Sequence, residues 1–199
     1  MKRKIFIFCV IFLCVFLCFL GYKFFITGNT KNIESTVQAD EYILNIKNYN
    51  IEARVTVWSN KNSNTYNLRQ YKKDGYQKQE IISDNMDQGI IIENKGNELV
   101  VKNTKIGLEK VFEDFEEITS NSLGLDSFIE DYKQTEEKKV TEDEKYYMLF
   151  ADVKKSRNIY IKTKILYINK QNGEIEKIEV KDVNNNRIML IEYISLEIL

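Results

Sequence analysis

Apolar side chains recur at two different periods along this chain, and the change of period predicts where helices and strands lie. Between Ser122 and Lys133 the apolar positions are spaced as on one side of an α-helix. These positions are Leu125, Phe128, Ile129 and Tyr132. Ser120 or Ser122 can cap the first turn of this helix. Because the sequence on both sides is strand-like, we expect the apolar stripe to be buried against a curved antiparallel sheet.

A second helix and a series of strands account for the rest of the chain after residue 35. Ser35 and Gln38 form a capping pair for a helix from about Thr36 to Lys47. From Tyr49 onward, apolar and polar residues alternate with a period of two, as in half-buried strands. The predicted strands are Tyr49–Trp58, Tyr66–Lys72, Tyr76–Ile82, Ile90–Glu93, Leu99–Lys102, Tyr147–Val153, Ile159–Ile168, Ile175–Val183 and Ile188–Ile198. The turns between neighbouring strands are too short for crossovers, which predicts antiparallel pairing.

Two segments have weaker patterns. Ile106–Ile118 has some helical spacing between loop-like flanks, so we expect an irregular or weakly helical segment there. Gln134–Lys145 is rich in glutamate and lysine, which is typical of a solvated loop. The predicted fold class is α+β, a curved antiparallel sheet wrapped around one or two helices.

The N-terminal segment has the pattern of a membrane helix. Lys2, Arg3 and Lys4 precede Ile5–Gly21, in which every residue but the last is apolar. The residues that we expect to anchor the chain in the membrane are Ile5, Phe8, Phe12, Phe16 and Leu20. On insertion scales such a run favours the membrane by a sum on the order of 5 kcal/mol, and the basic flank keeps the N-terminus in the cytoplasm. We therefore divide the chain into an anchor or signal segment (1–26), a tether (27–35) and an extracytoplasmic domain (36–199).

The form of the anchor is left open by the sequence. A long apolar run without a small-x-small cleavage site favours a retained helix over a cleaved signal peptide. Cys14 and Cys18 are candidate lipidation sites, but Leu13 and Leu17 stand where a lipoprotein signal needs a small residue. The third cysteine, Cys9, lies in the same segment, so the domain itself has no disulfide framework.

The charge balance and the residue types exclude several functions. Without Lys2, Arg3, Lys4 and Lys23, 25 basic residues face 30 acidic ones, a net charge of about −5. This balance argues against binding to nucleic acid. The sequence contains no histidine, which excludes Ser-His-Asp and Cys-His catalysis and any histidine-containing zinc site.

The remaining polar motifs do not predict catalysis or a cofactor. The acidic pairs, such as Glu136-Glu137, lack the apolar surroundings that would raise the pKa of one carboxyl for acid catalysis. Asp182, Asn184 and Asn186 imitate the start of a calcium loop, but Arg187 replaces the required glycine, so we expect a simple turn. We expect a non-enzymatic protein without a metal or cofactor.

Two apolar features are candidates for binding. Trp58 lies on the face of its strand opposite Val55, where it is either covered by the first helix or available as an anchor for a partner. The concave face of the sheet either encloses a lipid-sized cavity or is filled by the helix Ser122–Lys133, which we call the plug helix. The residues assigned to the concave face and the plug helix are Val55, Leu68, Leu125, Phe128, Ile129, Tyr132, Ile165 and Ile191.

Several segments carry a resemblance to a known family. The strand Tyr49–Val57 followed by Tyr66–Tyr71 and Tyr76–Ile82 resembles the opening of the LolA-like lipoprotein-carrier superfamily. Asn121-Ser122-Leu123 leading into the plug helix, and Ile168, Asn169, Gly173 and Glu174 in the late hairpin, resemble its germination lipoprotein branch, the GerS-related proteins. The resemblance covers nearly everything after residue 35.

This resemblance implies an antiparallel half-barrel and a role in spore germination, in which the protein partners a cortex peptidoglycan amidase. Our first hypothesis is therefore a membrane-anchored binding protein on the extracytoplasmic face of the cell or forespore membrane, engaging a cortex amidase or another envelope protein through its sheet. The alternative is a LolA-like protein that holds a lipid or lipoprotein acyl chain in the concave face. A retained anchor weakens this alternative, because a tethered domain cannot carry lipid between membranes.

Overall fold

The computed structural model describes residues 33, 35–59, 61–83, 89–113, 124–153 and 160–199. All of them belong to one compact unit, Ile33–Leu199. The predicted anchor, its residues Ile5, Phe8, Phe12, Phe16 and Leu20, and the candidate lipidation sites Cys14 and Cys18 lie outside the described residues. Among the described residues, no helix has the length and apolar character needed to cross a membrane.

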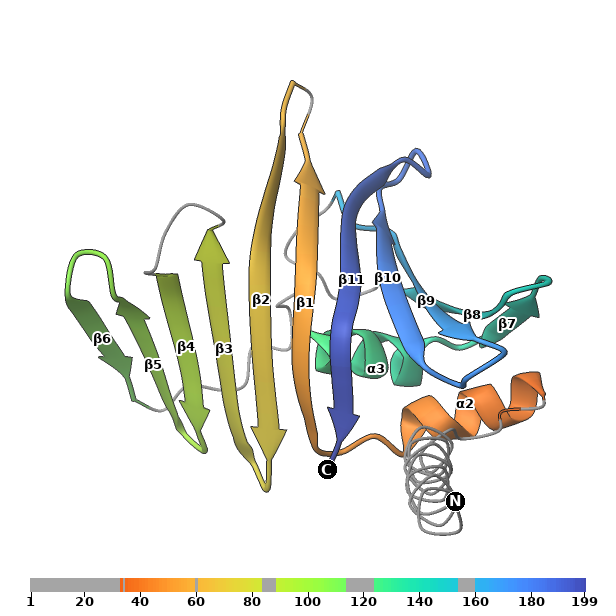
Figure 1. The fold of residues 1–199 in the computed structure, drawn as a ribbon, viewed down its shortest axis with the longest axis horizontal. Coiled ribbons are helices and arrows are strands. Elements are labelled where there is room, and N and C mark those ends of the chain that lie inside the picture. Colours follow the sequence, from red (N-terminus) through yellow and green to blue (C-terminus); the bar gives the residue numbers. More distant parts are fainter. Residues whose placement is uncertain (1–32, 34, 60, 84–88, 114–123, 154–159) are drawn as a thin grey trace, which may run out of the picture. The chain divides into compact units, whose positions relative to one another are not determined.

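The domain is built on a single antiparallel sheet of eleven strands (Figure 1). The strands are β1 (Tyr49–Trp58), β2 (Ser63–Lys73), β3 (Tyr76–Ser83), β4 (Gly89–Lys95), β5 (Glu98–Asn103), β6 (Leu108–Phe112), β7 (Lys139–Glu142), β8 (Tyr146–Asp152), β9 (Thr163–Asn169), β10 (Ile175–Lys181) and β11 (Arg187–Ile198). Their spatial order is β6-β5-β4-β3-β2-β1-β11-β10-β9-β8-β7. The predicted hairpins are therefore confirmed, and the sheet is open, with β6 and β7 at its two edges.

Two meanders are joined in the middle of the sheet by a long-range pairing that the sequence pattern does not reveal. β1 pairs with β11, so that Tyr49 lies opposite Ile198 and Val57 opposite Met189. The C-terminal Leu199 adds a hydrogen bond from its backbone N–H to the carbonyl of Asn48. This pairing places the first and last strands of the domain side by side.

Two helices, α2 (Thr36–Leu44) and α3 (Leu125–Gln134), lie on the same side of the sheet. The hydroxyl of Ser35 accepts a hydrogen bond from the backbone N–H of Gln38, as the capping pair predicts. α3 begins instead after Gly124, which provides no side-chain cap. The structure thus has Gly124 at the N-cap position of α3, and the predicted caps Ser120 and Ser122 lie outside the described residues.

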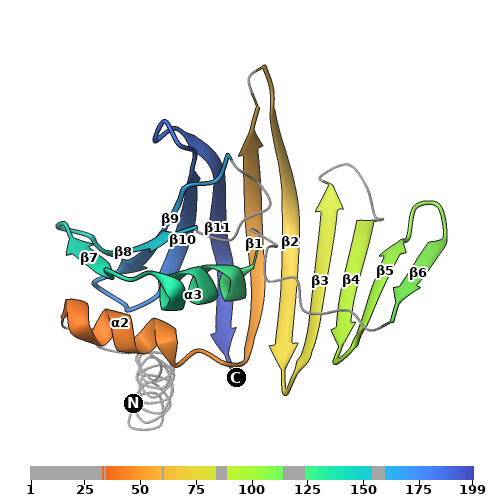
Figure 2. The same ribbon diagram turned by 180° about the vertical axis from the view of Figure 1, so that it is seen from behind.

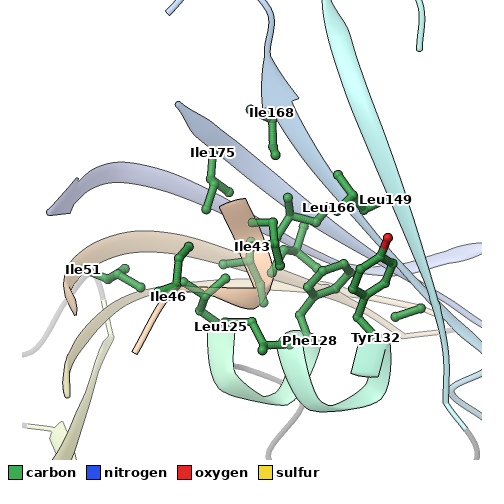
Figure 3. Close-up of a cluster of buried hydrophobic side chains, with 14 of the residues drawn as sticks. Ile43, Ile46, Ile51, Leu125, Phe128, Tyr132, Leu149, Leu166, Ile168 and Ile175 are labelled. Atoms are coloured by element: carbon green, nitrogen blue, oxygen red, sulfur yellow. The ribbon is translucent and has the colours of Figure 1, made fainter. Parts of the chain in front are cut away.

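α3 buries its apolar stripe in the main core, as its spacing predicts. The core cluster combines this stripe with Ala39 and Ile43 of α2 and with the inward side chains of β1 and β8–β11. The rings of Phe128 and Tyr132 stack with centroids 5.6 Å apart, and Figure 3 shows both pointing into the cluster near Leu149 and Leu166. Burying two aromatic rings in this way contributes a large share of the apolar burial of the helix.

Two local predictions are wrong. Ile106–Ile118 contains a strand, because Leu108–Phe112 form β6 as the return arm of a hairpin whose turn places Gly107 at φ +63°. The predicted loop Gln134–Lys145 contains β7, whose Val140 and Thr141 lie opposite Leu149 and Met148 of β8. In both segments, pairing with a stronger neighbouring strand decides a conformation that the local pattern leaves weak.

The two halves of the sheet differ in what covers them. Figures 1 and 2 show α2 and α3 against the part made of β1 and β7–β11, whereas no described helix lies against β3–β6. In β4–β6 only Val100 is buried among the described residues, at 7% exposure. The strongly curved, helix-filled region is therefore confined to one part of an otherwise extended sheet.

Candidate functional site

The concave face is a packed core in the described part of the domain. Val55, Leu68 and Ile191 are at most 1% exposed, and so are Leu125, Phe128 and Tyr132 of α3. Ile129 is 3% exposed. Side chains of α3 thus fill the part of the concave face against which this helix packs.

Ile165 does not share this face, which corrects its predicted assignment. Its neighbours Lys164 and Leu166 point to α3 and to the core, because Lys164 bonds to Asp131 and Leu166 belongs to the core cluster. Strand alternation then places Ile165 on the opposite face, between Phe150 and Glu179 of the adjacent strands.

That opposite face, which we call the outer face, carries an unusual amount of half-buried apolar surface. Along β8, Tyr147, Leu149 and Ala151 are buried in the core, whereas Tyr146, Met148 and Phe150 alternate with them and are half-buried. No described helix lies on this side of the sheet. A strand whose two faces are both apolar is typical of a sheet that is covered on both sides.

Trp58 lies on the outer face, so of its two predicted environments, cover by the first helix is the wrong one. α2 packs on the core side through Ala39 and Ile43, and Trp58 points to the other side of β1. The half-buried indole is instead covered by Arg187 of β11, whose guanidinium carbon lies 4.8 Å from the ring centroid. Arg187 keeps 45% of its side-chain surface exposed.

A chain of polar contacts connects Trp58 to the aromatic residues of β8 and β9. Arg187 Nη1 lies 3.5 Å from Glu179 Oε1, and Lys177 Nζ lies 3.2 Å from the same oxygen. Lys177 also lies 4.2 Å from the ring centroid of Tyr167. The Tyr167 ring in turn meets Tyr146 edge to face, with centroids 5.5 Å apart. We call Trp58, Arg187, Glu179, Lys177, Tyr167 and Tyr146 the Trp58 surface.

The electrostatics of this surface are fixed by its own contacts. Burial, followed by the nearby carboxylate of Glu179, raises the pKa of Tyr167 to about 12. The Tyr146 hydroxyl donates to Glu176 Oε2, and Lys145 Nζ lies 3.3 Å from the same oxygen. These bonds more than offset the effect of burial and lower the pKa of Glu176. The Tyr167 hydroxyl therefore stays protonated at neutral pH, and the polar groups of this surface contact partners within the domain.

This arrangement contains residue types that are common in protein interfaces. Tryptophan, tyrosine and arginine are the residues that most often carry the affinity of protein interfaces. Within the described ranges, no group of three metal-ligating side chains comes together. The calcium-like motif is a turn, in which Asp182 Oδ1 accepts hydrogen bonds from the backbone N–H groups of Asn184 and Asn186.

One sequence signal could have located the outer face more fully. Residues 146–151 have the sequence Tyr-Tyr-Met-Leu-Phe-Ala, without a strongly polar residue. This run indicates a strand with apolar side chains on both faces. Arg187 and Glu179 could not be found in this way. Their position beside Trp58 depends on the β1–β11 pairing, which joins residues far apart in the sequence.

Comparison with known protein families gives one match along almost the whole chain. The model of a family described as sporulation protein YdcC-like matches residues 2–197. The search of curated proteins gives no match.

Among solved structures, the chain is similar to the GerS lipoprotein of Clostridioides difficile in its complex with the CwlD amidase. The sequences are 28% identical, the match covers 85% of this chain and 98% of that chain, and the TM-score is 0.50. The predicted relationship to the GerS-related branch is confirmed by these findings.

Two further structures have lower scores. An uncharacterised conserved protein from Thermus thermophilus is 6% identical, with 82% of this chain and 85% of that chain covered and a TM-score of 0.49. A LolA superfamily protein from Nitrosomonas europaea is 14% identical, with 84% and 94% covered and a TM-score of 0.42.

Proposed function

Because this chain belongs to the YdcC-like family of sporulation proteins, we propose that it is a non-enzymatic binding protein that partners a cell-wall amidase during spore formation or germination. The observation that carries this proposal is the similarity to GerS, whose solved structure is a complex with an amidase. At 28% identity over 98% of GerS, the whole domain is shared rather than one motif.

The outer face supports the proposal from the structure itself. The Trp58 surface spans strands β1, β11, β10, β9 and β8. Its side chains contact one another through cation–π contacts, ion pairs and an edge-to-face ring contact. A stable interface covers about 800 Å² on each partner around a few aromatic or arginine anchors. Trp58 and Arg187 supply an aromatic and an arginine anchor of this kind on one side of the sheet.

A binding role also fits the residues that the chain lacks. It contains no histidine, and its only cysteines lie in residues 1–26. In the described part of the domain, carboxylates such as Glu179, Asp131 and Asp126 are engaged in ion pairs with lysine or arginine. The partner would therefore perform any hydrolysis of peptidoglycan.

We further propose that Ile5–Gly21 holds the domain at the membrane, with residues from about 27 onward on the extracytoplasmic side. The support is the apolar run after Lys2, Arg3 and Lys4. This location would place the domain in the compartment where a wall amidase works. The length of the tether would keep the complex within about 30 Å of the bilayer.

The packing of α3 favours protein binding over lipid binding. A LolA-like half-barrel that carries lipid needs free space along its concave face, but Phe128 and Tyr132 fill that face and are fully buried. An acyl chain could enter the part of the face filled by α3 only if α3 moved away from the sheet. That movement would expose the buried pair Lys164–Asp131.

The proposal is tested by binding of the full-length protein, solubilised in a mild detergent, to the wall amidases encoded by the same genome. Size-exclusion chromatography with light scattering should show a defined complex with one of them and no complex with lysozyme of similar size. Mass spectrometry of the protein extracted from membranes should give the mass of the chain with residues 1–26 retained. Failure of every amidase to bind would contradict the proposed function, whereas a mass that lacks the first segment would contradict only the retained anchor.

A further inference from the structure

Four aromatic rings on the outer face each have a cation lying over them. Arg187 covers Trp58 at 4.8 Å, and Lys177 covers Tyr167 at 4.2 Å, measured from the charged group to the ring centroid. The other two pairs are Lys145 over Tyr146 at 4.7 Å and Lys139 over Phe150 at 4.9 Å. These rings come from β1, β9 and β8, so the cations form a layer over the apolar side chains of this face.

Two carboxylates that pair with these cations are less exposed than the cations themselves. Glu179 is only 12% exposed and bonds to Lys177 and Arg187, whereas the Arg187 side chain is 45% exposed. Glu176 is 32% exposed and bonds to Lys145, which is 56% exposed. At these contacts an approaching molecule therefore reaches the cation before the carboxylate, whereas Glu192, opposite Lys177 on β11, is an exposed carboxylate on the same face.

This layer contrasts with the charge of the chain as a whole. After residue 26 the chain has 25 basic and 30 acidic residues, so the domain repels acidic partners on average. A local layer of cations on a negatively charged domain selects one orientation of approach. Arginine and lysine that already lie on aromatic rings also lose less conformational freedom when they bind a carboxylate.

We infer that the Trp58 surface, together with Lys145 over the Tyr146 ring, docks onto an acidic patch of the partner protein. Carboxylates of the partner would face Arg187, Lys177 and Lys145, and an apolar centre would face Trp58. This inference rests on the proposed function, because it specifies the chemistry of the partner at the same surface. Guanidinium and ammonium groups that meet carboxylates form shorter and stronger hydrogen bonds than neutral groups. Partly desolvated pairs of this kind give both orientation and a fast association rate.

The test is a set of charge reversals in the full-length protein, with amidase affinity and association rate measured over a range of salt concentrations. Arg187→Glu and Lys177→Glu should each weaken binding at least about tenfold. Lys47→Glu makes the same change of charge at an exposed position in the α2–β1 connection and should leave binding within about twofold. Arg187→Lys keeps the charge and should restore most of the affinity that Arg187→Glu loses.

Folding and alternative ligands are controlled separately. Thermal unfolding of each variant identifies a change that damages the sheet, and the neutral variant Arg187→Gln then replaces a damaged Arg187→Glu, with an expected loss of at least about threefold. The association rate of the unaltered protein should fall at least about fivefold between roughly 50 and 300 mM NaCl.

The outcomes separate this inference from the proposed function. If no amidase binds the unaltered protein, the proposed function is wrong. If an amidase binds but the reversals act like Lys47→Glu and salt has no effect, the acidic-patch inference is wrong while the proposed function stands. Binding to vesicles of phosphatidylglycerol is measured as a further control. Tight binding to these vesicles that depends on Arg187 in the same way would assign the surface to a phosphate-bearing ligand and overturn the inference.

Discussion

Lys164 Nζ lies 2.6 Å from Asp131 Oδ2, an ion pair that joins strand β9 to helix α3 inside the domain. Nζ also donates a hydrogen bond of 2.6 Å to Ser127 Oγ, one turn earlier on α3. The lysine side chain is only 3% exposed. Burial lowers the pKa of Lys164, an effect that the Asp131 carboxylate opposes. The pair therefore ties the plug helix to β9 through a lysine that is almost completely buried.

Removing the two partners of this pair should have unequal effects. Asp131→Ala leaves the buried ammonium without its carboxylate and should lower the free energy of unfolding by about 3 kcal/mol. Lys164→Met leaves the Asp131 carboxylate without its lysine, but this carboxylate is 19% exposed and can be hydrated. The free energy of unfolding should therefore fall by about 1 kcal/mol or less. Urea unfolding of the fragment 33–199, which contains every described core residue, measures both. A larger loss for Lys164→Met than for Asp131→Ala would contradict this assignment.

Two tyrosine hydroxyls provide a matched pair of substitutions. The Tyr132 hydroxyl donates to Asp40 Oδ1 at 2.6 Å and joins α3 to α2, so Tyr132→Phe should cost about 1.5 kcal/mol of stability. The Tyr193 hydroxyl is buried and has no hydrogen-bond partner among the described residues. Tyr193→Phe should therefore be neutral or stabilising by up to about 1 kcal/mol. Calorimetry of both variants checks the prediction, which is wrong if Tyr193→Phe is the more destabilising change.

The elevated pKa of Tyr167, about 12, predicts a loss of stability at alkaline pH. Below about pH 10 the phenol is protonated in both the folded and the unfolded chain, so its contribution to stability is complete. Between pH 10 and 12 the unfolded chain releases this proton more readily, and that contribution declines. The difference in unfolding free energy between the unaltered fragment and Tyr167→Phe should therefore shrink over this range. A difference that stays constant up to pH 12 would argue against the buried contact with Glu179.

The wing formed by β4–β6 should open locally without unfolding the core. Its only buried residue in the described part is Val100, whereas β1 buries Tyr49, Ile51, Ala53 and Val55. Because local opening requires little loss of apolar burial there, backbone amides of β5 and β6 should exchange with deuterium at least about a hundredfold faster than those of β1. Equal protection of β5 and β1 would show that the wing is stabilised by a contact outside the described residues.

Periodicity alone is sufficient to predict the elements that have a strong pattern of their own. The stripe of α3, the alternation in β1 and the Asn172-Gly173 hairpin all follow from residues within one short segment. β6 and β7 are short, polar or exposed, and they form because a neighbouring strand offers its backbone hydrogen bonds. Such edge strands cannot be recognised from a local window.

The functional surface has the same division. The alternation in β1 predicts which face of the strand carries Trp58. It does not predict whether the helices cover that face or the opposite one. Arg187 decides the environment of Trp58, and it comes from the far end of the chain through the β1–β11 pairing. The sequence pattern places Ile165 on the wrong face because its strand carries apolar residues on both sides, and only the contact of Lys164 with Asp131 distinguishes them.

The central claim, that the outer face binds the amidase, is tested most directly by isothermal titration of the amidase into three full-length proteins. These are the unaltered chain, Trp58→Ala, and Val37→Ala at a position of α2 that is 65% exposed on the helix side of the domain. We predict that Trp58→Ala weakens binding at least about thirtyfold, equivalent to about 2 kcal/mol, while its thermal unfolding stays close to that of the unaltered protein. Val37→Ala should bind within about twofold of the unaltered protein. Equal affinities for all three proteins, or a loss confined to Val37→Ala, would contradict the account.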